Sequence, residues 1–225
     1  MKTAVIIGLR DDKSLAWGIG KALMDKDVQV IFGYQQRNKA TVLPLLKECV
    51  GFPIEITDSA SINRFVEETK KITKKVDFLV HSIAFAKKEH LQGSLLDVNL
   101  EGWNLAMHVS AYSLIELIRA FKPLLQESSV LTLTYRGSRQ VVKGYHLMGA
   151  CKAALESEVK YLAEELRPNI RVNALSAPAM PTTAAKAIES FEKLYANEKK
   201  ISLEQLGKAA VNILFSKKTG EIIQV

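Results

Sequence analysis

The sequence predicts an α/β fold in which a doubly wound parallel sheet carries helices on both faces. Two observations predict it. Short runs of apolar and β-branched residues alternate with longer segments whose apolar residues recur at helical spacing, as in repeated βαβ units. The length of 225 residues suits one α/β domain, and no linker, repeat or low-complexity segment divides it. We therefore expect a single domain over residues 1–225.

The composition is that of an ordinary globular protein. Apolar residues make up 48% of the chain and charged residues 24%, so a large core can form without a metal or disulfide. The two cysteines, Cys49 and Cys151, form no pattern, and we expect reduced thiols in a cytoplasmic protein. The first apolar run is too short for a signal peptide, and none approaches the length of a membrane span. We expect no membrane association.

The charge and the histidines exclude some classes of function. The net charge is +7, but the basic residues are scattered over the predicted helices. Such scatter does not favour nucleic-acid binding, whereas a positive surface suits anionic cofactors and acidic protein partners. The four histidines show no metal-ligand spacing, so we expect no metal site.

The predicted strands are short runs in which apolar and β-branched residues predominate. The run TAVII at residues 3–7 is typical of a strand buried on both faces. VQVIFGY, FLVH, LTLT and IRVNAL have the same character further along the chain. The predicted strands are residues 3–7, 28–34, 52–56, 78–81, 131–134, 170–175 and 221–225.

The predicted helices lie between these strands. Ser14 and Asp58 can cap two of them, because their side-chain oxygens can accept hydrogen bonds from first-turn amides. Residues 95–125 carry a wide apolar stripe, which we expect to pack on the sheet and on a second copy. Residues 182–215 are expected to form a helical lid, above all through their first helix. The predicted helices are residues 14–27, 40–49, 59–75, most of 95–125, a long one around 145–155, 182–197 and 202–215.

The first strand, loop and helix have the order of a dinucleotide-binding βαβ unit, although the G-x-G-x-x-G pattern is absent. Gly8 would provide the turn after the strand. The hydroxyl of Ser14 and the backbone amide of Ile19 could contact a pyrophosphate near the helix start. A plain βα turn without a ligand is the alternative.

The ends of the second and third strands would face the adenosine half of such a ligand. No acidic residue ends the second strand, where Rossmann-type folds place the group that binds the adenosine ribose. Gln35 could hydrogen-bond a ribose hydroxyl, whereas Arg37 and Lys39 could meet a 2′-phosphate. Glu55 and Ile56 fall where an adenine edge would lie. These residues leave NADH and NADPH both open.

Two further strand ends contribute small or stiff segments to the same edge. Ser82 and Ala84 follow the fourth strand and would let a cofactor approach the backbone closely. His81 precedes them, but a single histidine at the end of a strand is more often structural than catalytic. The loop 176–182, which contains two prolines, follows the sixth strand.

Tyr145 and Lys152 form the pattern with most chemical meaning. Lys152 follows Tyr145 by seven residues in a predicted helix, so two turns place them on one face. A fixed ammonium near a phenol favours the phenolate, which predicts a lowered pKa for Tyr145. Such a phenol can donate a hydrogen bond or proton to an oxygen that gains charge. Chance pairing of an interface tyrosine with a solvated lysine is the alternative.

Taken together, these residues resemble the short-chain dehydrogenase/reductase superfamily, and more closely its bacterial-type enoyl-[acyl-carrier-protein] reductases. Those reductases use Tyr-x6-Lys with a second tyrosine ten residues earlier, which matches Tyr135, Tyr145 and Lys152. The resemblance covers nearly the whole chain. Its other motifs are Gly8-x5-Ser14-x-Ala16-x-Gly18-Ile19, Tyr34-Gln35, Val80-His81-Ser82-Ile83-Ala84-Phe85-Ala86, Ser110-Ala111-Tyr112-Ser113, Leu131 to Thr134, and Arg171-Val172-Asn173-Ala174-x-Ser176-Ala177.

The resemblance implies a Rossmann-like fold and reduction of an enoyl thioester, carried on acyl carrier protein or coenzyme A, in fatty-acid synthesis. It implies NADH or NADPH as the cofactor and a homotetramer, or a dimer, as the assembly. Hydride would reach C3, while the Tyr145 hydroxyl stabilises the enolate oxygen. Lys152 would hold the nicotinamide ribose.

The resemblance also assigns residues by position. The implied catalytic residues are Tyr145, Lys152 and Tyr135. The implied substrate contacts are Tyr135, Tyr145, Met148 and Ala86. The implied cofactor-binding residues are Gly8, Ser14, Ile19, Gln35, Glu55, Ile56, Ser82, Ile83, Ala84, Lys152, Met180 and Thr182.

Two alternatives remain beside the enoyl reductase. The family usually has Gly-Pro-Ile where this chain has Pro178-Ala179-Met180, and the segment between Thr182 and Ile201 is a few residues shorter. These departures are compatible with a cofactor-binding paralogue of weakened activity. A short-chain reductase that acts on a ketone is the other alternative.

Overall fold

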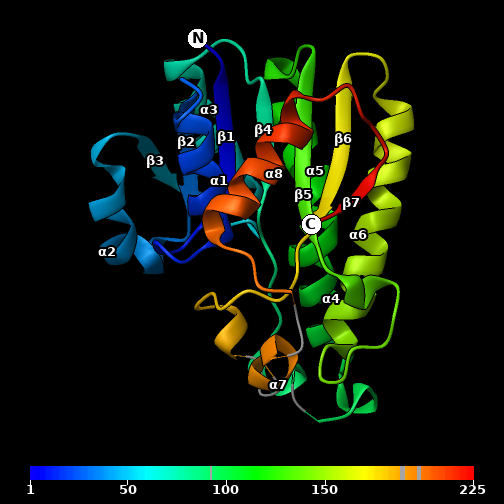
Figure 1. The fold of residues 1–225 in the computed structure, drawn as a ribbon. Helices are drawn as coiled ribbons and strands as arrows, with labels where there is room; N and C mark the ends of the chain where they lie inside the picture. Colours follow the sequence, from blue (N-terminus) through cyan, green and yellow to red (C-terminus); the bar gives the residue numbers. More distant parts are fainter. Residues whose placement is uncertain (92, 188–190, 197–198) are drawn as a thin grey trace.

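The computed structural model describes residues 1–91, 93–187, 191–196 and 199–225. Its centre is a seven-stranded parallel sheet with helices on both faces (Figure 1), so the predicted Rossmann-like doubly wound α/β fold in a single domain is confirmed. The strand order is β3-β2-β1-β4-β5-β6-β7. This order reverses between β1 and β4, which is the switch point where open α/β sheets bind ligands.

The elements agree with the predicted series in number and order of strands. The strands are β1 (Thr3–Leu9), β2 (Gln29–Tyr34), β3 (Val50–Pro53), β4 (Phe78–His81), β5 (Ser128–Thr134), β6 (Ile170–Ser176) and β7 (Ile222–Gln224). The helices are α1 (Leu15–Met24), α2 (Lys39–Val42), α3 (Ser59–Ile72), α4 (Leu100–Met107), α5 (Ser113–Phe121), α6 (His146–Glu165), α7 (Phe191–Ala196) and α8 (Leu203–Phe215).

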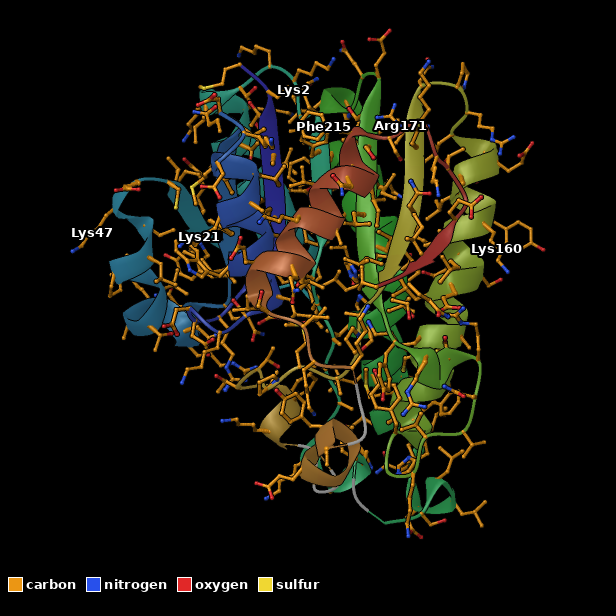
Figure 2. The ribbon with its side chains drawn as sticks, viewed as in Figure 1. Lys2, Lys21, Lys47, Lys160, Arg171 and Phe215 are labelled. Carbon is orange, nitrogen blue, oxygen red and sulfur yellow. The ribbon has the colours of Figure 1, made fainter. Side chains whose placement is uncertain are left out.

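Two hydrophobic cores hold the helices on the sheet. Apolar residues of α1 and α8 pack on one face, and those of α3, α5 and α6 pack on the other. Figure 2 shows Lys47 and Lys160 pointing into solvent on opposite sides of the molecule, which agrees with a scattered positive charge. Among the described residues, no helix combines the length and apolarity that a membrane crossing requires.

Three predicted boundaries differ from the structure. The helix predicted over 40–49 ends as α2 at Val42, and a 3₁₀ segment (Leu43–Lys47) follows because Pro44 cannot donate to a continuing α-helix. β3 spans Val50–Pro53, so Ile54 and Ile56 are buried beyond the strand. β5 begins at Ser128, three residues earlier than predicted, since two fully buried serines open it.

The predicted lid is shorter than residues 182–215. α8 is a core helix: Leu206, Ala210 and Leu214 are fully buried against the sheet and α1. An amphipathic helix with so much apolar surface gains more from packing on the sheet than from lying over a site. For the first predicted lid helix, residues 182–197, the lid stays a prediction; residues 188–190 and 197 lie outside the described residues. Figure 1 places α7 beyond the carboxyl ends of the strands.

Candidate active site

Gly8 and Ser82 meet at the switch point of the sheet. Gly8 has a φ of +118°, which L side chains rarely adopt, and a Cβ there would collide with the carbonyl of Ser82. The Ser82 amide donates to the Ile7 carbonyl at 2.9 Å. The ends of β1 and β4 are therefore in direct contact. Because Gly8 has no side chain, its backbone is accessible where a ligand would bind.

The start of α1, where a pyrophosphate contact is predicted, has no side-chain cap. Ser14 is the N-cap residue, but its hydroxyl donates to the Asp11 carbonyl at 2.6 Å instead of capping the helix. The first turn contains no acidic residue, so its amides lack a side-chain acceptor. Ile19 lies one turn further on with its side chain fully buried, whereas Leu15 is the first helical residue. The contact between the Ile19 amide and a pyrophosphate stays a prediction.

Gln35 connects the ends of β2 and β3. Its amide donates to Glu55 Oε2 at 3.3 Å, and its Oε1 accepts from Arg37 Nη2 at 2.7 Å and Nε at 3.0 Å. The structure thus joins three of the residues predicted for the adenosine half. Ile56 is buried in the core below α3, so its side chain is not displayed at this edge.

The remaining predicted cofactor residues are divided between the surface and the core. Ala84 is exposed, and Ile83 is partly buried against the core on the α5 face. Met180 is buried in the opposite core, under α1 and α8. Thr182 follows it, and its hydroxyl accepts from the Ala185 amide at 3.1 Å. The backbone of 180–182 lies just after the carboxyl end of β6, although the Met180 side chain points to the core.

Three of the predicted substrate contacts share a small cluster apart from the two cores. Ala86, Met148 and Tyr145 pack there with Leu147 and other apolar residues of α4 and α6. Tyr135, the fourth, meets Tyr145 edge-on, with 4.9 Å between the ring centroids. An apolar cluster with two phenols at its border suits an acyl chain that ends in a polar carbonyl.

The prediction that Lys152 lowers the pKa of Tyr145 is wrong. Burial, followed by the nearby Tyr135 and Cys151, raises the pKa of the Tyr145 phenol above its usual value of 10. Desolvation disfavours the phenolate, and Lys152 is not among the groups that shift this pKa. Tyr145 therefore keeps its proton at neutral pH, and a protonated phenol is the form that donates a hydrogen bond.

Lys152 lies in the second turn of α6 and is 5% exposed. Its Nζ donates to the carbonyl of Leu133, in β5, at 2.8 Å. Burial lowers the pKa of Lys152 to about 8, against the opposing effects of Cys151 and Glu156. The ammonium is thus anchored to the sheet between the two cores and the tyrosine pair, with donors left for another acceptor.

His81 is structural, as predicted. Ser113 Oγ donates to the Val109 carbonyl, so it accepts from His81 Nε2 at 2.8 Å. Thr132 Oγ1 then donates to His81 Nδ1 at 2.8 Å. Burial, and next the charge of Lys152, lower the pKa of His81 to about 3. The imidazole joins β4, β5 and α5 in its neutral form.

We expect His81 to make stability depend on pH. Its folded pKa lies below the unfolded value of 6.5, so only the unfolded chain binds a proton as the pH falls from 6.5 towards 3. Acidification from pH 8 to pH 5 should therefore cost about 2 kcal/mol of unfolding free energy. Denaturant titrations of the wild type and of His81→Gln measure this, because glutamine bonds without titrating. Equal pH slopes for both proteins would contradict it.

The residues that the sequence interpretation missed are Arg139 and Glu156. Glu156 is 6% exposed on α6, one turn after Lys152, and Arg139 lies 3.4 Å from its Oε2. The spacing of four residues between Lys152 and Glu156 on the predicted helix is a sequence signal that could have indicated Glu156.

A switch-point glycine, a start of α1 without a side-chain cap and a tyrosine–lysine pair at the start of α6 define a Rossmann-like reductase of the short-chain dehydrogenase/reductase type. Within that class, the chain belongs to the enoyl-(acyl carrier protein) reductase family, whose sequence model matches residues 8–214. The predicted family is therefore confirmed.

Similar proteins extend over the full length. The chain is 39% identical to "Enoyl-[acyl-carrier-protein] reductase [NADH] FabI" of Enterococcus faecalis, covering 100% of this chain and 95% of that protein. It is 36% identical to "Enoyl-[acyl-carrier-protein] reductase [NADH] 1" of Rhizobium meliloti, covering 100% and 88%.

Solved structures show the same fold. The reductase of Anaplasma phagocytophilum in complex with NAD superposes with a TM-score of 0.93 at 35% identity, over 99% of this chain and 91% of that one. The Bacillus cereus reductase with NADP+ and indole naphthyridinone gives 0.93 at 33% identity, over 100% and 94%.

Proposed function

We propose that the protein is an enoyl-[acyl-carrier-protein] reductase of fatty-acid synthesis that reduces the 2,3-double bond of a carrier-bound enoyl thioester with NADH. The observation that carries the proposal is the edge-on pair of Tyr135 and Tyr145 beside the apolar cluster of Ala86 and Met148, with the buried Lys152 on the same helix. This arrangement supplies an acyl surface, a phenolic donor and a cation at one edge of the sheet.

The residues of this chain would act on the thioester oxygen. When bound, NADH supplies the hydride that adds to C3 of the enoyl thioester. Negative charge then collects on the thioester oxygen as an enolate. The Tyr145 hydroxyl, kept protonated by its raised pKa, donates a hydrogen bond to that oxygen, and this bond strengthens as the charge grows. Lys152 would hold the ribose hydroxyls next to the nicotinamide and keep the local field positive.

Several features support NADH as the preferred cofactor. Gln35 and Glu55 meet at the end of β2, so a carboxylate lies beside the position of the adenosine ribose. A 2′-phosphate would be repelled by that carboxylate, although Arg37 partly offsets it from the other side of Gln35. The similar proteins from Enterococcus faecalis and Rhizobium meliloti are named as NADH enzymes.

The test is a spectrophotometric assay of purified protein with an enoyl thioester on acyl carrier protein and on coenzyme A, run with NADH and with NADPH. The proposal predicts oxidation of NADH, with a lower kcat/KM for NADPH. Oxidation only with ketones would favour the carbonyl reductase. Cofactor binding without turnover on any substrate would favour the weakened paralogue.

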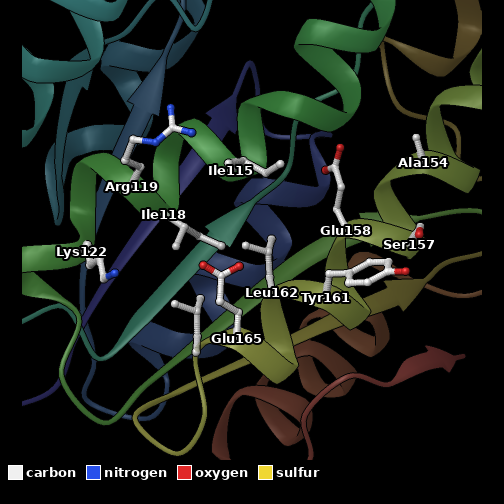
Figure 3. Close-up of a pocket in the computed structure, with 11 residues that line it drawn as sticks. Ile115, Ile118, Arg119, Lys122, Ala154, Ser157, Glu158, Tyr161, Leu162 and Glu165 are labelled. Carbon is white, nitrogen blue, oxygen red and sulfur yellow. The ribbon is translucent and has the colours of Figure 1, made fainter.

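We also propose that a second copy covers the outer face of α5 and α6, as in the expected homotetramer or dimer. A groove of about 590 Å³ runs between these helices, lined by residues such as Ile118 and Leu162 (Figure 3). Glu158 borders it; burial raises its pKa to about 7, and its Oε2 has no hydrogen-bond partner among the described residues. Arg119 and Lys122 line the same groove, so two copies related by a two-fold axis could pair opposite charges.

Sedimentation measures this assembly. Tyr161 is 76% exposed at the groove, so Tyr161→Glu should shift the protein towards monomers, whereas Lys70→Glu on α3 should not. A monomeric wild type would contradict the assembly.

We propose a cytoplasmic location because the two cysteines, Cys49 and Cys151, are free thiols, and cell fractionation tests it.

A further inference from the structure

We propose that Glu156 is a positioning residue of the reductase site, which, with Arg139, fastens the turn that carries Tyr135 and supports the ring of Tyr145. The inference rests on the proposed function and deepens it, because it names what holds the two phenols in place. Neither residue contacts the reacting atoms.

Glu156 connects α6 to the end of β5. Its Oε1 accepts from Thr134 Oγ1 at 2.8 Å and lies 2.6 Å from Ser138 Oγ. The single Ser138 proton could also reach the Tyr135 carbonyl at 2.9 Å, but the carboxylate is closer and charged, so it is the stronger acceptor. Because the carboxylate is buried, each of these bonds is made in a low-dielectric environment.

Arg139, directly after the same turn, makes a second connection to Glu156. Its Nε lies 3.4 Å from Glu156 Oε2, and its Nη2 donates to Ser176 Oγ at 3.3 Å. Ser176 ends β6, next to the loop that leads to Met180. One guanidinium therefore joins the carboxylate of α6 to the edge of the sheet on the cofactor side.

The turn fastened in this way is packed against both phenols. It is a 3₁₀ turn (Arg136–Ser138) directly after Tyr135. A Cβ on Gly137 would collide with the Tyr145 ring, and a Cβ on Gly149 would come within 2.7 Å of the Gly137 carbonyl. The backbone of the turn thus lies flat on Tyr145 and on α6, and any outward movement of the turn would remove the support of that ring.

The carboxylate also faces Lys152, four residues earlier on α6. The groups around the Lys152 ammonium are Glu156 and the neutral Cys151 on its own helix, the neutral His81 on β4, and the Leu133 carbonyl on β5. After Cys151, Glu156 opposes the lowering of the lysine pKa by burial, and it is a carboxylate. Loss of its charge should lower the pKa of Lys152 further, so less of the ammonium would be charged above neutral pH.

Two substitutions test the contacts of Glu156 and those of Arg139 separately. Glu156→Gln keeps an oxygen for Thr134 and Ser138 but turns an N–H group towards Arg139. Arg139→Met removes the contacts of the guanidinium with Glu156 and Ser176. Because the Arg139 side chain is 41% exposed, the variant should fold. We expect kcat to fall about tenfold in each, since small misplacements of reacting groups can cost about 10²-fold. At pH 6, where Lys152 keeps its charge, the KM for NADH should stay unchanged, because Gly8, Ser14 and Gln35 are untouched.

The matched control is Arg167→Met, which breaks the exposed Arg167–Glu164 pair at the far end of the same helix. Glu156→Gln should also move the alkaline limb of the kcat profile to lower pH.

The variant that carries both Glu156→Gln and Arg139→Met should be no slower than the worse single variant if the two residues act as one unit. Wild-type kcat in both single variants, or kcat losses that multiply in the double variant, would overturn the proposal.

Trypsin cleavage after Arg136 and Lys143 in the ligand-free proteins gives a readout without activity. Both variants should be cleaved faster at these sites than the wild type and Arg167→Met, while thermal unfolding reports whether each variant is folded. An inactive wild type would count against the proposed function alone, because proteolysis would still test whether Glu156 fastens the turn. Unchanged cleavage would count against the role of Glu156.

Discussion

Tyr145→Phe is expected to lower kcat by about 10² to 10³-fold, the usual cost of removing one donor to a developing oxyanion. The ring contact with Tyr135 and the apolar cluster needs only the aromatic ring, so the fold and the KM for NADH should be preserved. Steady-state kinetics with saturating NADH and an enoyl thioester measure the loss.

Tyr161→Phe is the matched control, since Tyr161 is on the same helix but 76% exposed and remote from the cluster. It should retain full activity. A Tyr145→Phe enzyme with kcat within a factor of two of the wild type would show that the phenolic hydroxyl does not stabilise the enolate oxygen.

Lys152→Met is expected to weaken NADH binding by about 10 to 150-fold, which corresponds to the loss of about 1.5–3 kcal/mol from a charged hydrogen bond. Methionine fills a similar space, but it leaves the Leu133 carbonyl without its donor. In the wild type, the pKa of about 8 means that the ammonium is charged below pH 8 and loses its charge above it. NADH affinity should therefore fall as the pH rises through about 8.

Fluorescence titration of NADH at pH 6 to 10 measures both effects. Lys160→Met, an exposed position on the same helix, should bind like the wild type at every pH. If Lys152→Met binds NADH with wild-type affinity, or if the wild type shows no pH dependence, then Lys152 does not hold the ribose.

Much of the fold could be predicted because it depends on local patterns. Short runs of apolar and β-branched residues marked all seven strands, and Gly8 marked the turn that only a glycine can make. Errors arose where a neighbouring element decides the outcome. Ser128 and Ser129 belong to a strand because β4 and β6 pair with them, and α8 is a core helix because α1 and the sheet cover its apolar face.

The site was predictable to the extent that spacing encodes it. The interval between Tyr145 and Lys152 indicated the proposed catalytic pair, and the ring contact with Tyr135 agrees with the ten-residue interval. The direction of the Tyr145 pKa shift could not be predicted, because it is set by burial and by Tyr135 and Cys151, and spacing does not report burial. Glu156 was missed because a glutamate on a helix resembles a surface charge until three donors are seen around it.

Transfer of deuterium from NADH labelled at C4 to crotonyl-acyl carrier protein tests the central claim most directly. The account predicts a butyryl thioester with deuterium at C3 and a hydrogen from solvent at C2, detected by mass spectrometry and NMR of the released acid. Recovery of unlabelled crotonyl thioester, or deuterium on a carbinol carbon, would contradict it.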